Sequence, residues 1–348
     1  MAKRIRVLVV DDSIVFRTAI TRGLAKDPQI EIVASAFNTH DARDKIMQTN
    51  PDVITLDVEM PGMSGIEFLK ILMPQRPIPV IVVSAVDGIV FEAMNAGAVD
   101  FIAKPEPGGQ EAFMRELAGK IKVAAVARLR EPGAATAAAA VQTNATQNAS
   151  LSVNPDTVVA IGASTGGTEA TGQILKALPA DFPAILITQH MPPVFTRMYA
   201  ERLNREGKLN VSEAKDGEAV RSGHAYVAPG DRQMMLVRRG GVYFIKLAGT
   251  QKVSGHCPSV NVLFDSVAEA AGKNALGVIL TGMGADGALG LLHMREAGAY
   301  TIGQDQQSCV VYGMPMEAHK LGAVVRQSPL SMIPSILINQ LKLRERVR

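Results

Sequence analysis

Residues 157–170, TVVAIGASTGGTEA, hold the stretch that decides the fold of the second half of the chain. Its apolar, mostly β-branched beginning predicts a buried strand, its glycines predict a tight turn, and the residues beyond them are typical of a helix. A strand that passes through a short turn into a helix is the repeating unit of a parallel α/β sheet. The turn also carries Ser164, which is either a nucleophile or only a turn residue.

Further apolar runs in the second half have the length of buried strands. They are AILITQ, AYVAP and LGVILTG, at residues 184–189, 225–229 and 276–282. The run MMLVRRGGVYFIK, residues 234–246, has Gly240 and Gly241 between two apolar segments, which predicts a β-hairpin added to the parallel sheet. We therefore expect a Rossmann-like, doubly wound α/β domain with an added hairpin.

The first half alternates strand-like and helix-like segments five times. Its strand-like runs are IRVLVV, IEIVASA, DVITLD, IPVIVVSA and AVDFIA, at residues 5–10, 30–36, 52–57, 78–85 and 98–103. Runs such as DARDKIMQT and GIEFLKILM lie between them and have helical spacing. This βαβ series predicts another doubly wound parallel sheet, with helices on both faces.

Length and composition predict where these two domains meet. A chain of 348 residues exceeds one ordinary hydrophobic core, so two domains are expected. Residues 133–154, GAATAAAAVQTNATQNASLSVN, contain no charged residue and cannot bury enough apolar surface to fold alone. We predict a first domain over residues 1–128, a flexible linker over 129–154 and a second domain over 155–348.

Charge and cysteine content exclude several functional classes. Lys and Arg number 16 against 16 Asp and Glu in residues 1–130, and 20 against 17 in residues 131–348, which argues against a nucleic-acid partner. The sequence shows no transmembrane or secretory pattern. Two cysteines, Cys257 and Cys309, imply neither a disulfide framework nor a zinc cluster. We expect a cytoplasmic protein.

Polar residues close the predicted strands of the first half. Carboxyl ends of parallel strands meet at one edge of a sheet, so these residues should converge. They are Asp11, Asp12, Asp57, Ser84 and Lys104. Clustered carboxylates favour a cation such as Mg²⁺, and an aspartate beside it can accept a phosphoryl group. Each residue alone could instead be a helix cap, but five together favour a site.

Ser164 lies in a literal G-x-S-x-G at a predicted strand-to-helix junction. The same sequence motif is also compatible with a phosphate-binding turn or a simple helix cap, so it does not identify a nucleophile. A nucleophile needs a base, and two histidines qualify: His190 follows the strand at 184–189, and His256 lies in a glycine-flanked loop. His224 precedes its strand and should lie at the opposite edge. The remaining histidines fall in helix-like segments: His40, His293 and His319.

The segment LGVILTGMGADGALG supplies the best acid to orient the base. Asp286 follows a strand and a glycine loop, which places it at the same predicted edge as Ser164. Backbone N–H groups near Thr165, Met283 and Gly284 would stabilise an oxyanion, with His256 as a further contact to substrate or oxyanion. Whether His190 or His256 faces the serine stays open.

The motifs VLVVDDS, TLDVEMPGMSG, VVSA and DFIAKP resemble the receiver domain of a two-component response regulator, which has a flavodoxin-like fold. The resemblance implies phosphorylation by a histidine kinase at Asp57. It implies Mg²⁺ binding by Asp12, Asp57 and the Glu59 carbonyl, with Asp11 as supporting acid. It also implies phosphate contacts from Ser84 and Lys104 and a switch role for Phe101.

The motifs IGASTGG, ITQHMP, GHCPSVNVLF and TGMGADG closely resemble the catalytic domain of the chemotaxis response-regulator methylesterases, the CheB family. The resemblance implies hydrolysis of glutamyl methyl esters on the cytoplasmic part of chemoreceptors, with deamidation of glutamines as a companion activity. Ser164, His190 and Asp286 would form the triad, no cofactor would be needed for hydrolysis, and phosphorylation of the receiver would activate the enzyme.

Two other functions compete with this interpretation. The glycine turn at 162–167 would suit a response regulator whose second domain binds a nucleotide or phosphorylated ligand without hydrolysis. That alternative lacks an acidic residue for a ribose about 20 residues downstream. A DNA-binding output is the weakest alternative, because no basic recognition helix is present in the sequence pattern.

Overall fold

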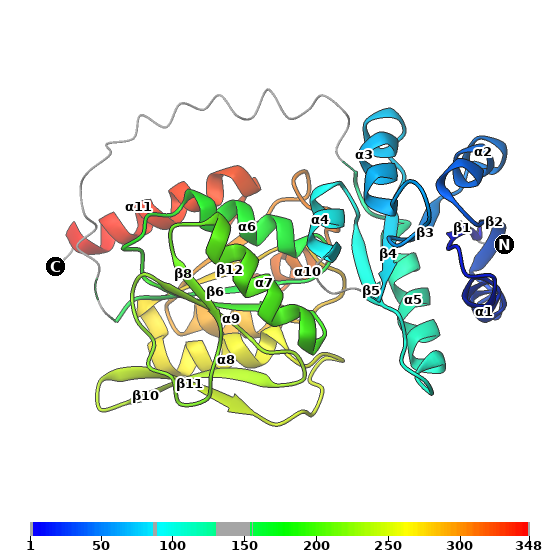
Figure 1. Ribbon diagram of the computed structural model, residues 1–348. Coiled ribbons are helices and arrows are strands. Elements are labelled where there is room, and N and C mark those ends of the chain that lie inside the picture. Colours follow the sequence, from blue (N-terminus) through cyan, green and yellow to red (C-terminus); the bar gives the residue numbers. More distant parts are fainter. Residues whose placement is uncertain (1–2, 86–88, 130–153, 155, 347–348) are drawn as a thin grey trace. The chain divides into compact units, whose positions relative to one another are not determined.

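The structure is a computed structural model, and it describes residues 3–85, 89–129, 154 and 156–346. The chain divides into two compact units, residues 1–141 and 142–348, and each is described by itself (Figure 1). The predicted linker lies outside the described residues except at 129 and 154. The boundaries expected at 128 and 155 therefore stay predictions.

The first unit is a five-stranded parallel sheet in the order β2-β1-β3-β4-β5. Its strands are β1 Ile5–Val10, β2 Ile30–Ala36, β3 Val53–Asp57, β4 Val80–Ser84 and β5 Asp100–Ala103. Its helices are α1 Ile14–Leu24, α2 Thr39–Thr49, α3 Gly65–Gln75, α4 Val90–Asn95 and α5 Gln110–Ala124. The five strands expected from the sequence are confirmed.

Local sequence explains why these elements begin where they do. Every residue of β3 and β4 is buried, as a strand covered by helices on both faces requires. Helix α3 begins with a capping box, in which the Ser64 hydroxyl accepts from the Glu67 N–H while the Glu67 carboxylate accepts from the Ser64 N–H. Helices α1 and α5 pack together through the rings of Phe16 and Phe113, whose centroids lie 5.7 Å apart.

The second unit contains a seven-stranded parallel sheet in the order β14-β13-β12-β6-β7-β9-β8. Its strands are β6 Val158–Ala163, β7 Ala184–Gln189, β8 Asn210–Glu213, β9 His224–Val227, β12 Ala275–Ile279, β13 Tyr300–Gln304 and β14 Arg326–Ser328. Its helices are α6 Gly167–Ala177, α7 Pro193–Glu206, α8 Val260–Ala271, α9 Ala288–Glu296, α10 Met314–Lys320 and α11 Ile333–Arg346, with 3-10 turns at Gly272–Asn274 and Leu330–Met332. A doubly wound α/β unit is confirmed.

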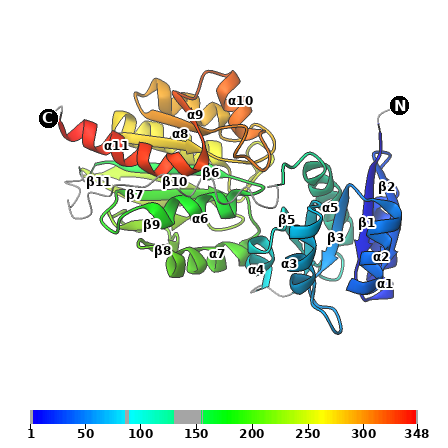
Figure 2. The same cartoon turned by 90° about the horizontal axis from the view of Figure 1, so that it is seen from above.

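Helices cover both faces of this sheet. Helices α8 and α9 pack together on one side, and α6 and α7 on the other (Figure 2). Strands β6 and β7 are buried along their whole length at the centre of the sheet. Their carboxyl ends, beside that of β12, therefore lie in a well-supported position at one edge.

The hairpin expected at residues 234–246 is present as β10 Gln233–Arg239 and β11 Val242–Ala248, but it does not extend the parallel sheet. It forms a separate antiparallel pair. The physical reason is its inner face: alternate side chains such as Leu236 and Ile245 are buried in the core that also contains Phe264 of α8. The prediction that the hairpin joins the main sheet was wrong, because its apolar face covers a helix.

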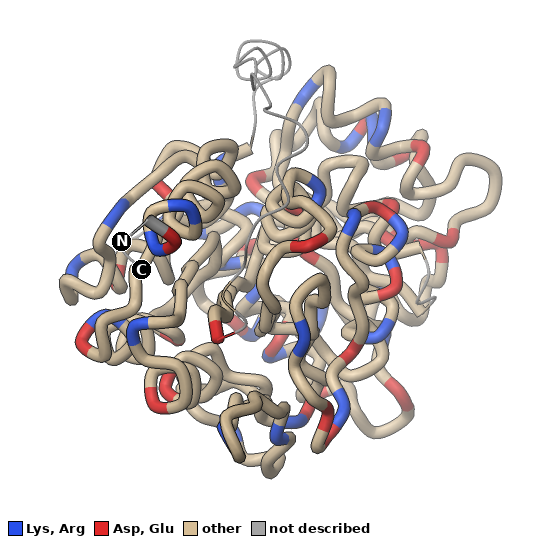
Figure 3. Tube along the Cα trace, turned by 90° about the vertical axis from the view of Figure 1, so that its left-hand side faces the viewer, with Lys and Arg blue, Asp and Glu red and all other residues tan. Residues whose placement is uncertain are grey.

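Two further features of the described part of the chain are its distribution of charge and the apolar character of its helices. Cationic and anionic positions are intermixed along the tube in Figure 3. None of the helices in the described part of the chain combines the length and the apolar character that crossing a membrane requires.

Candidate active site

The first unit brings four charged side chains together at the carboxyl edge of its sheet. Asp11 follows β1 and Asp57 ends β3, and both are buried. Lys104 follows β5, with Nζ 2.6 Å from Asp57 Oδ2 and 3.1 Å from Asp11 Oδ2. Asp12 is exposed, and it offers a carboxylate oxygen within 4.8 Å of oxygens from Asp11 and Asp57.

The negative charge of this cluster exceeds its positive charge. Burial raises the pKa of the Asp11 carboxyl, helped by the nearby Asp57 charge, and this outweighs the lowering effect of Lys104. Burial alone would lower the pKa of Lys104, but hydrogen bonding and attraction to Asp57 and Asp11 raise it. Three carboxylates facing one ammonium leave negative charge in excess, and their hard oxygens fit Mg²⁺.

The other residues predicted for this edge lie on the neighbouring strands. Ser84 is buried at the end of β4, and Phe101 is buried in the adjacent β5. The Phe101 ring meets Phe91 edge-on, with centroids 6.3 Å apart. Glu59 is exposed, and its N–H lies 3.2 Å from Asp57 Oδ1 as a hydrogen-bond donor. The structure thus brings Glu59 to the cluster through its backbone.

In the second unit, Ser164 occupies the turn between β6 and α6. Its N–H donates to the Thr281 carbonyl at 3.0 Å, and its own carbonyl accepts from the Gly167 N–H at 2.7 Å. These internal bonds occupy N–H groups that a phosphate-cradling turn would need, which disfavours the ligand-binding alternative. Gly282 packs so closely that an added Cβ would lie 2.6 Å from Ser164 Cβ. The loop after β12 therefore lies directly against the serine.

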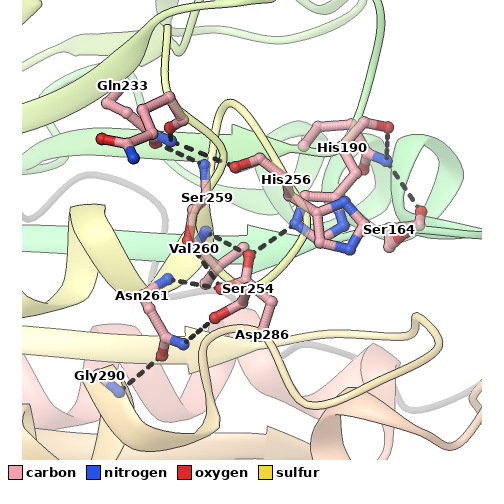
Figure 4. Close-up of polar contacts among 12 residues, drawn as sticks. Ser164, His190, Gln233, Ser254, His256, Ser259, Val260, Asn261, Asp286 and Gly290 are labelled. Atoms are coloured by element: carbon pink, nitrogen blue, oxygen red, sulfur yellow. Dashed lines mark hydrogen bonds and ion pairs between the residues drawn. The ribbon is translucent and has the colours of Figure 1, made fainter. Parts of the chain in front are cut away.

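His190 follows β7 and faces Asp286. Its Nε2 lies 2.8 Å from Asp286 Oδ2, and its side chain is almost fully buried. Its other ring nitrogen, Nδ1, is buried without a hydrogen-bond partner among the described residues. In Figure 4 the imidazole lies between Asp286 and Ser164. This arrangement leaves Nδ1 as the atom available to a nearby hydroxyl.

Asp286 lies in the loop between β12 and α9, and its carboxylate reaches the N-terminus of α8, where it accepts several hydrogen bonds. Besides His190 it accepts from the Ser259 hydroxyl at 2.7 Å and from the N–H groups of Val260 at 2.7 Å and Asn261 at 3.2 Å (Figure 4). Burial alone would raise its pKa, but the hydrogen bonds and the attraction of His190 outweigh burial and hold the pKa below its usual value. A negative charge at a helix N-terminus is further stabilised by the helix dipole.

His256 lies directly against His190. Its ring stacks on that of His190, with centroids 3.6 Å apart and planes 6° from parallel. Its carbonyl accepts from Gln233 Nε2 at 3.2 Å, which ties its loop to β10. Of the two histidines left open by the sequence, His190 is bonded to Asp286, and the ring of His256 packs on that of His190.

The residues predicted to stabilise an oxyanion border the same turn. Met283 is 48% exposed, and Gly284 has the left-handed backbone angle φ of +87°. Neither N–H donates a hydrogen bond within the part of the chain that the structure describes. Thr165 is buried, and its carbonyl accepts from the Thr281 hydroxyl at 3.0 Å.

The remaining histidines lie as expected. His224 is the first residue of β9, at the opposite edge from Ser164. The other three lie in helices: His40 in α2, His293 in α9 and His319 in α10.

Sequence reasoning missed the groups that hold these side chains. Ser259, Gln189 and Thr281 were not singled out, although all are buried and bonded to the site. One signal was present: Ser259 directly precedes an apolar helical run, which is the signature of a helix N-terminus. That signature marks a cap but does not reveal that Asp286 arrives there from a distant loop.

The two edges together define a class of protein. One α/β unit has an acidic sheet edge with a lysine, and a second α/β unit has a serine, a histidine and an aspartate at its sheet edge. Family models match both parts, the CheB methylesterase model over residues 159–337 and the response regulator receiver domain over residues 7–113. The chain belongs to the CheB methylesterase family.

Relatives of known name match the chain along nearly its whole length. The protein-glutamate methylesterase/protein-glutamine glutaminase 2 of Syntrophomonas wolfei is 52% identical over 97% of this chain and 99% of its own. The protein-glutamate methylesterase/protein-glutamine glutaminase of Salmonella choleraesuis is 47% identical over 99% of both chains. The solved catalytic domain of Thermotoga maritima CheB methylesterase is 39% identical, with a TM-score of 0.52, and covers 53% of this chain and 98% of that one.

Proposed function

We propose that this chain is a phosphorylation-activated protein-glutamate methylesterase and protein-glutamine glutaminase, whose catalytic residues are Ser164, His190 and Asp286. The observation that carries the proposal is the 2.8 Å contact of His190 with a carboxylate that three further donors hold in place. The names of the similar proteins supply the substrate class.

The chemistry follows from the atoms at this edge. Ser164 Oγ attacks the ester carbonyl while His190 Nδ1, which has no other partner among the described residues, takes the hydroxyl proton. The ionised Asp286 stabilises the imidazolium and keeps the ring oriented. The tetrahedral oxyanion is held by N–H groups of Thr165, Met283 and Gly284.

The reaction is completed in two stages, loss of methanol from the tetrahedral intermediate and hydrolysis of the resulting acyl-enzyme. The imidazolium returns its proton to the departing methanol, which leaves a glutamyl ester on Ser164. Water, deprotonated by His190, attacks this ester, and the imidazolium returns the proton to Ser164 Oγ as it leaves. The products are a glutamate side chain with a free carboxylate in the receptor and the original serine. A glutamine side chain undergoes the same steps with ammonia as the leaving group, which accounts for the second activity.

The first unit acts as the regulator in this proposal. A histidine kinase is the phosphodonor, Asp57 accepts the phosphoryl group, and Lys104 and Ser84 contact the added oxygens. Asp11, Asp12, Asp57 and the Glu59 carbonyl would hold Mg²⁺, whose charge would offset the carboxylates and the incoming phosphate. Phosphorylation shifts Phe101 and relieves inhibition of the second unit.

The substrate is the methylated cytoplasmic part of a chemoreceptor, so the chain works in the cytoplasm in sensory adaptation. We would measure methanol release from methylated receptor by wild type, Ser164→Ala and Asp57→Asn, each with and without a small-molecule phosphodonor. Wild type should be stimulated by the phosphodonor, Ser164→Ala should be inactive, and Asp57→Asn should keep unstimulated activity only. Methanol release by Ser164→Ala at the wild-type rate would refute the proposed nucleophile.

A further inference from the structure

Gln189 is a buried polar residue that the triad does not use. It ends β7 directly before His190, and its side chain is 3% exposed. Its amide nitrogen Nε2 donates to the Ser164 carbonyl at 2.9 Å and to the His190 carbonyl at 3.3 Å. One side-chain amide thus links the backbone of the proposed nucleophile to the backbone of the proposed base.

The fold satisfies only one end of this side-chain amide, its nitrogen. Its oxygen Oε1 is buried without a hydrogen-bond partner among the described residues, and leaving a buried acceptor unpaired costs free energy. An apolar side chain of similar volume would avoid this cost. The space around the amide is also narrow, since a Cβ added at Gly167 would come within 2.3 Å of Oε1. A polar side chain that is buried here in spite of the cost of desolvating its oxygen points to a role in the site.

Peptide geometry shows what the amide controls. The Ser164 carbonyl and the Thr165 N–H belong to one planar trans peptide, in which they point in opposite directions. Gln189 Nε2 and the Gly167 N–H both bind that carbonyl. Fixing the carbonyl toward β7 and α6 therefore aims the Thr165 N–H the opposite way.

The neighbouring peptides of the turn are held from the other side, by Thr281, which follows β12. The Ser164 N–H donates to the Thr281 carbonyl, and the Thr281 hydroxyl donates to the Thr165 carbonyl. With Gln189 in place, each peptide from Ser164 to Thr165 is therefore fixed by a bond to Gln189 in β7 or to Thr281 after β12. Catalytic donors that are fixed before the reaction need no reorganisation when the oxyanion forms.

We infer that Gln189 is a positioning residue that aims the Thr165 N–H at the oxyanion of the tetrahedral intermediate. The same side chain ties the Ser164–Thr165 peptide to the backbone of His190. The inference rests on the proposed function, because it assigns this residue a part in that reaction. It requires no contact between Gln189 and the substrate. Its loss should therefore affect the chemical step and leave substrate binding unchanged.

The test compares full-length Gln189→Met with wild type. Methionine fills similar space but cannot donate to either carbonyl. Because removing one oxyanion donor costs about 10²–10³ in rate, misaiming one should lower kcat roughly 10- to 100-fold. KM should change by less than about twofold, as expected for an interaction that is made only in the transition state.

Thr188→Val provides the matched control. Thr188 precedes Gln189 in the same strand and is equally buried, but its hydroxyl has no partner among the described residues. This variant should keep wild-type kcat. The pH profile of kcat should keep its midpoint in Gln189→Met, since the exchange changes no titratable group, whereas a displaced imidazole would move that midpoint.

The outcomes separate this inference from the proposed function. If Ser164→Ala is inactive and Gln189→Met keeps wild-type kcat, or raises KM at unchanged kcat, Gln189 is no positioning residue and the triad still stands. If Ser164→Ala remains active, the proposed function itself fails. If Gln189→Met does not fold, Gln189→Asn decides, because it keeps the amide but withdraws it by one methylene: reduced kcat supports the role and wild-type kcat overturns it.

Discussion

The two units place their functional carboxylates at the same kind of sheet edge but treat them in opposite ways. In the first unit, Asp11 lies beside another buried carboxylate and its pKa is raised. In the second, Asp286 receives four hydrogen bonds and its pKa is lowered. The first arrangement leaves excess negative charge that a cation could neutralise, as the proposed phosphorylation requires. The second keeps the Asp286 carboxylate ionised, as the proposed catalytic cycle requires. A switch benefits from local instability, and a catalyst from preorganisation.

Removing the charge of Asp286 should produce the largest effect. In Asp286→Asn the imidazole loses its charged partner, so kcat should fall about 10⁴-fold, as in other triads. Methanol release under saturating substrate would measure the change. Asp265→Asn is the control, because Asp265 also lies 2.8 Å from a histidine, His293, but on the exposed surface. An equal loss in both variants would contradict a special role for the buried pair.

The stacked histidine should contribute less. An aromatic contact of this kind is worth about 0.5–1.5 kcal/mol, so His256→Ala should lower kcat by roughly two- to tenfold. His256→Phe keeps a flat ring against His190 and should recover most of the rate. His224→Ala removes a histidine stacked on Tyr226 at the opposite edge and should have no effect. If the alanine and phenylalanine variants lose activity equally, a polar role of His256 replaces the stacking role.

The acidic edge of the first unit should respond in the opposite direction to mutation. Asp11→Asn removes one of three clustered carboxylates, so the free energy of unfolding of this unit should rise by about 1 kcal/mol without Mg²⁺, the size of one screened contact between like charges. Chemical denaturation of the full chain would measure it. Asp44→Asn, an exposed aspartate on α2, should leave the value unchanged. A decrease in stability would mean that the bond to Lys104 outweighs the repulsion.

The smallest expected effect is a dependence of stability on pH. The pKa of Asp286 is lower in the folded protein than its ordinary value of 3.8, so this group stabilises the fold above that value. The contribution is lost as the pH falls through the folded pKa. The difference in unfolding free energy between wild type and Asp286→Asn should therefore be constant from about pH 7 to 5 and shrink below about pH 4. A constant difference at all pH values would contradict the assigned shift.

Much of the fold could be predicted because buried parallel strands have a distinctive sequence pattern. All five strands of the first unit were expected within about two residues of their ends. In the second unit, β8, β13 and β14 were missed, since NVSE and RQS are short and polar and YTIGQ lacks a strong apolar run. The hairpin was expected, but its packing on α8 was not, because periodicity shows which side of a strand is apolar and not what covers it.

The sequence by itself determined which residues would meet. Ser164, His190 and Asp286 each follow a predicted strand, and parallel topology delivers such positions to one edge. Only the tertiary structure decided how they meet: His190 is bonded to Asp286, α8 supplies that carboxylate with donors, and Gln189 links the serine to the histidine. Strand order follows from chain pattern, but hydrogen bonds depend on distances of a few tenths of an ångström between elements far apart in the chain, and these are set by packing.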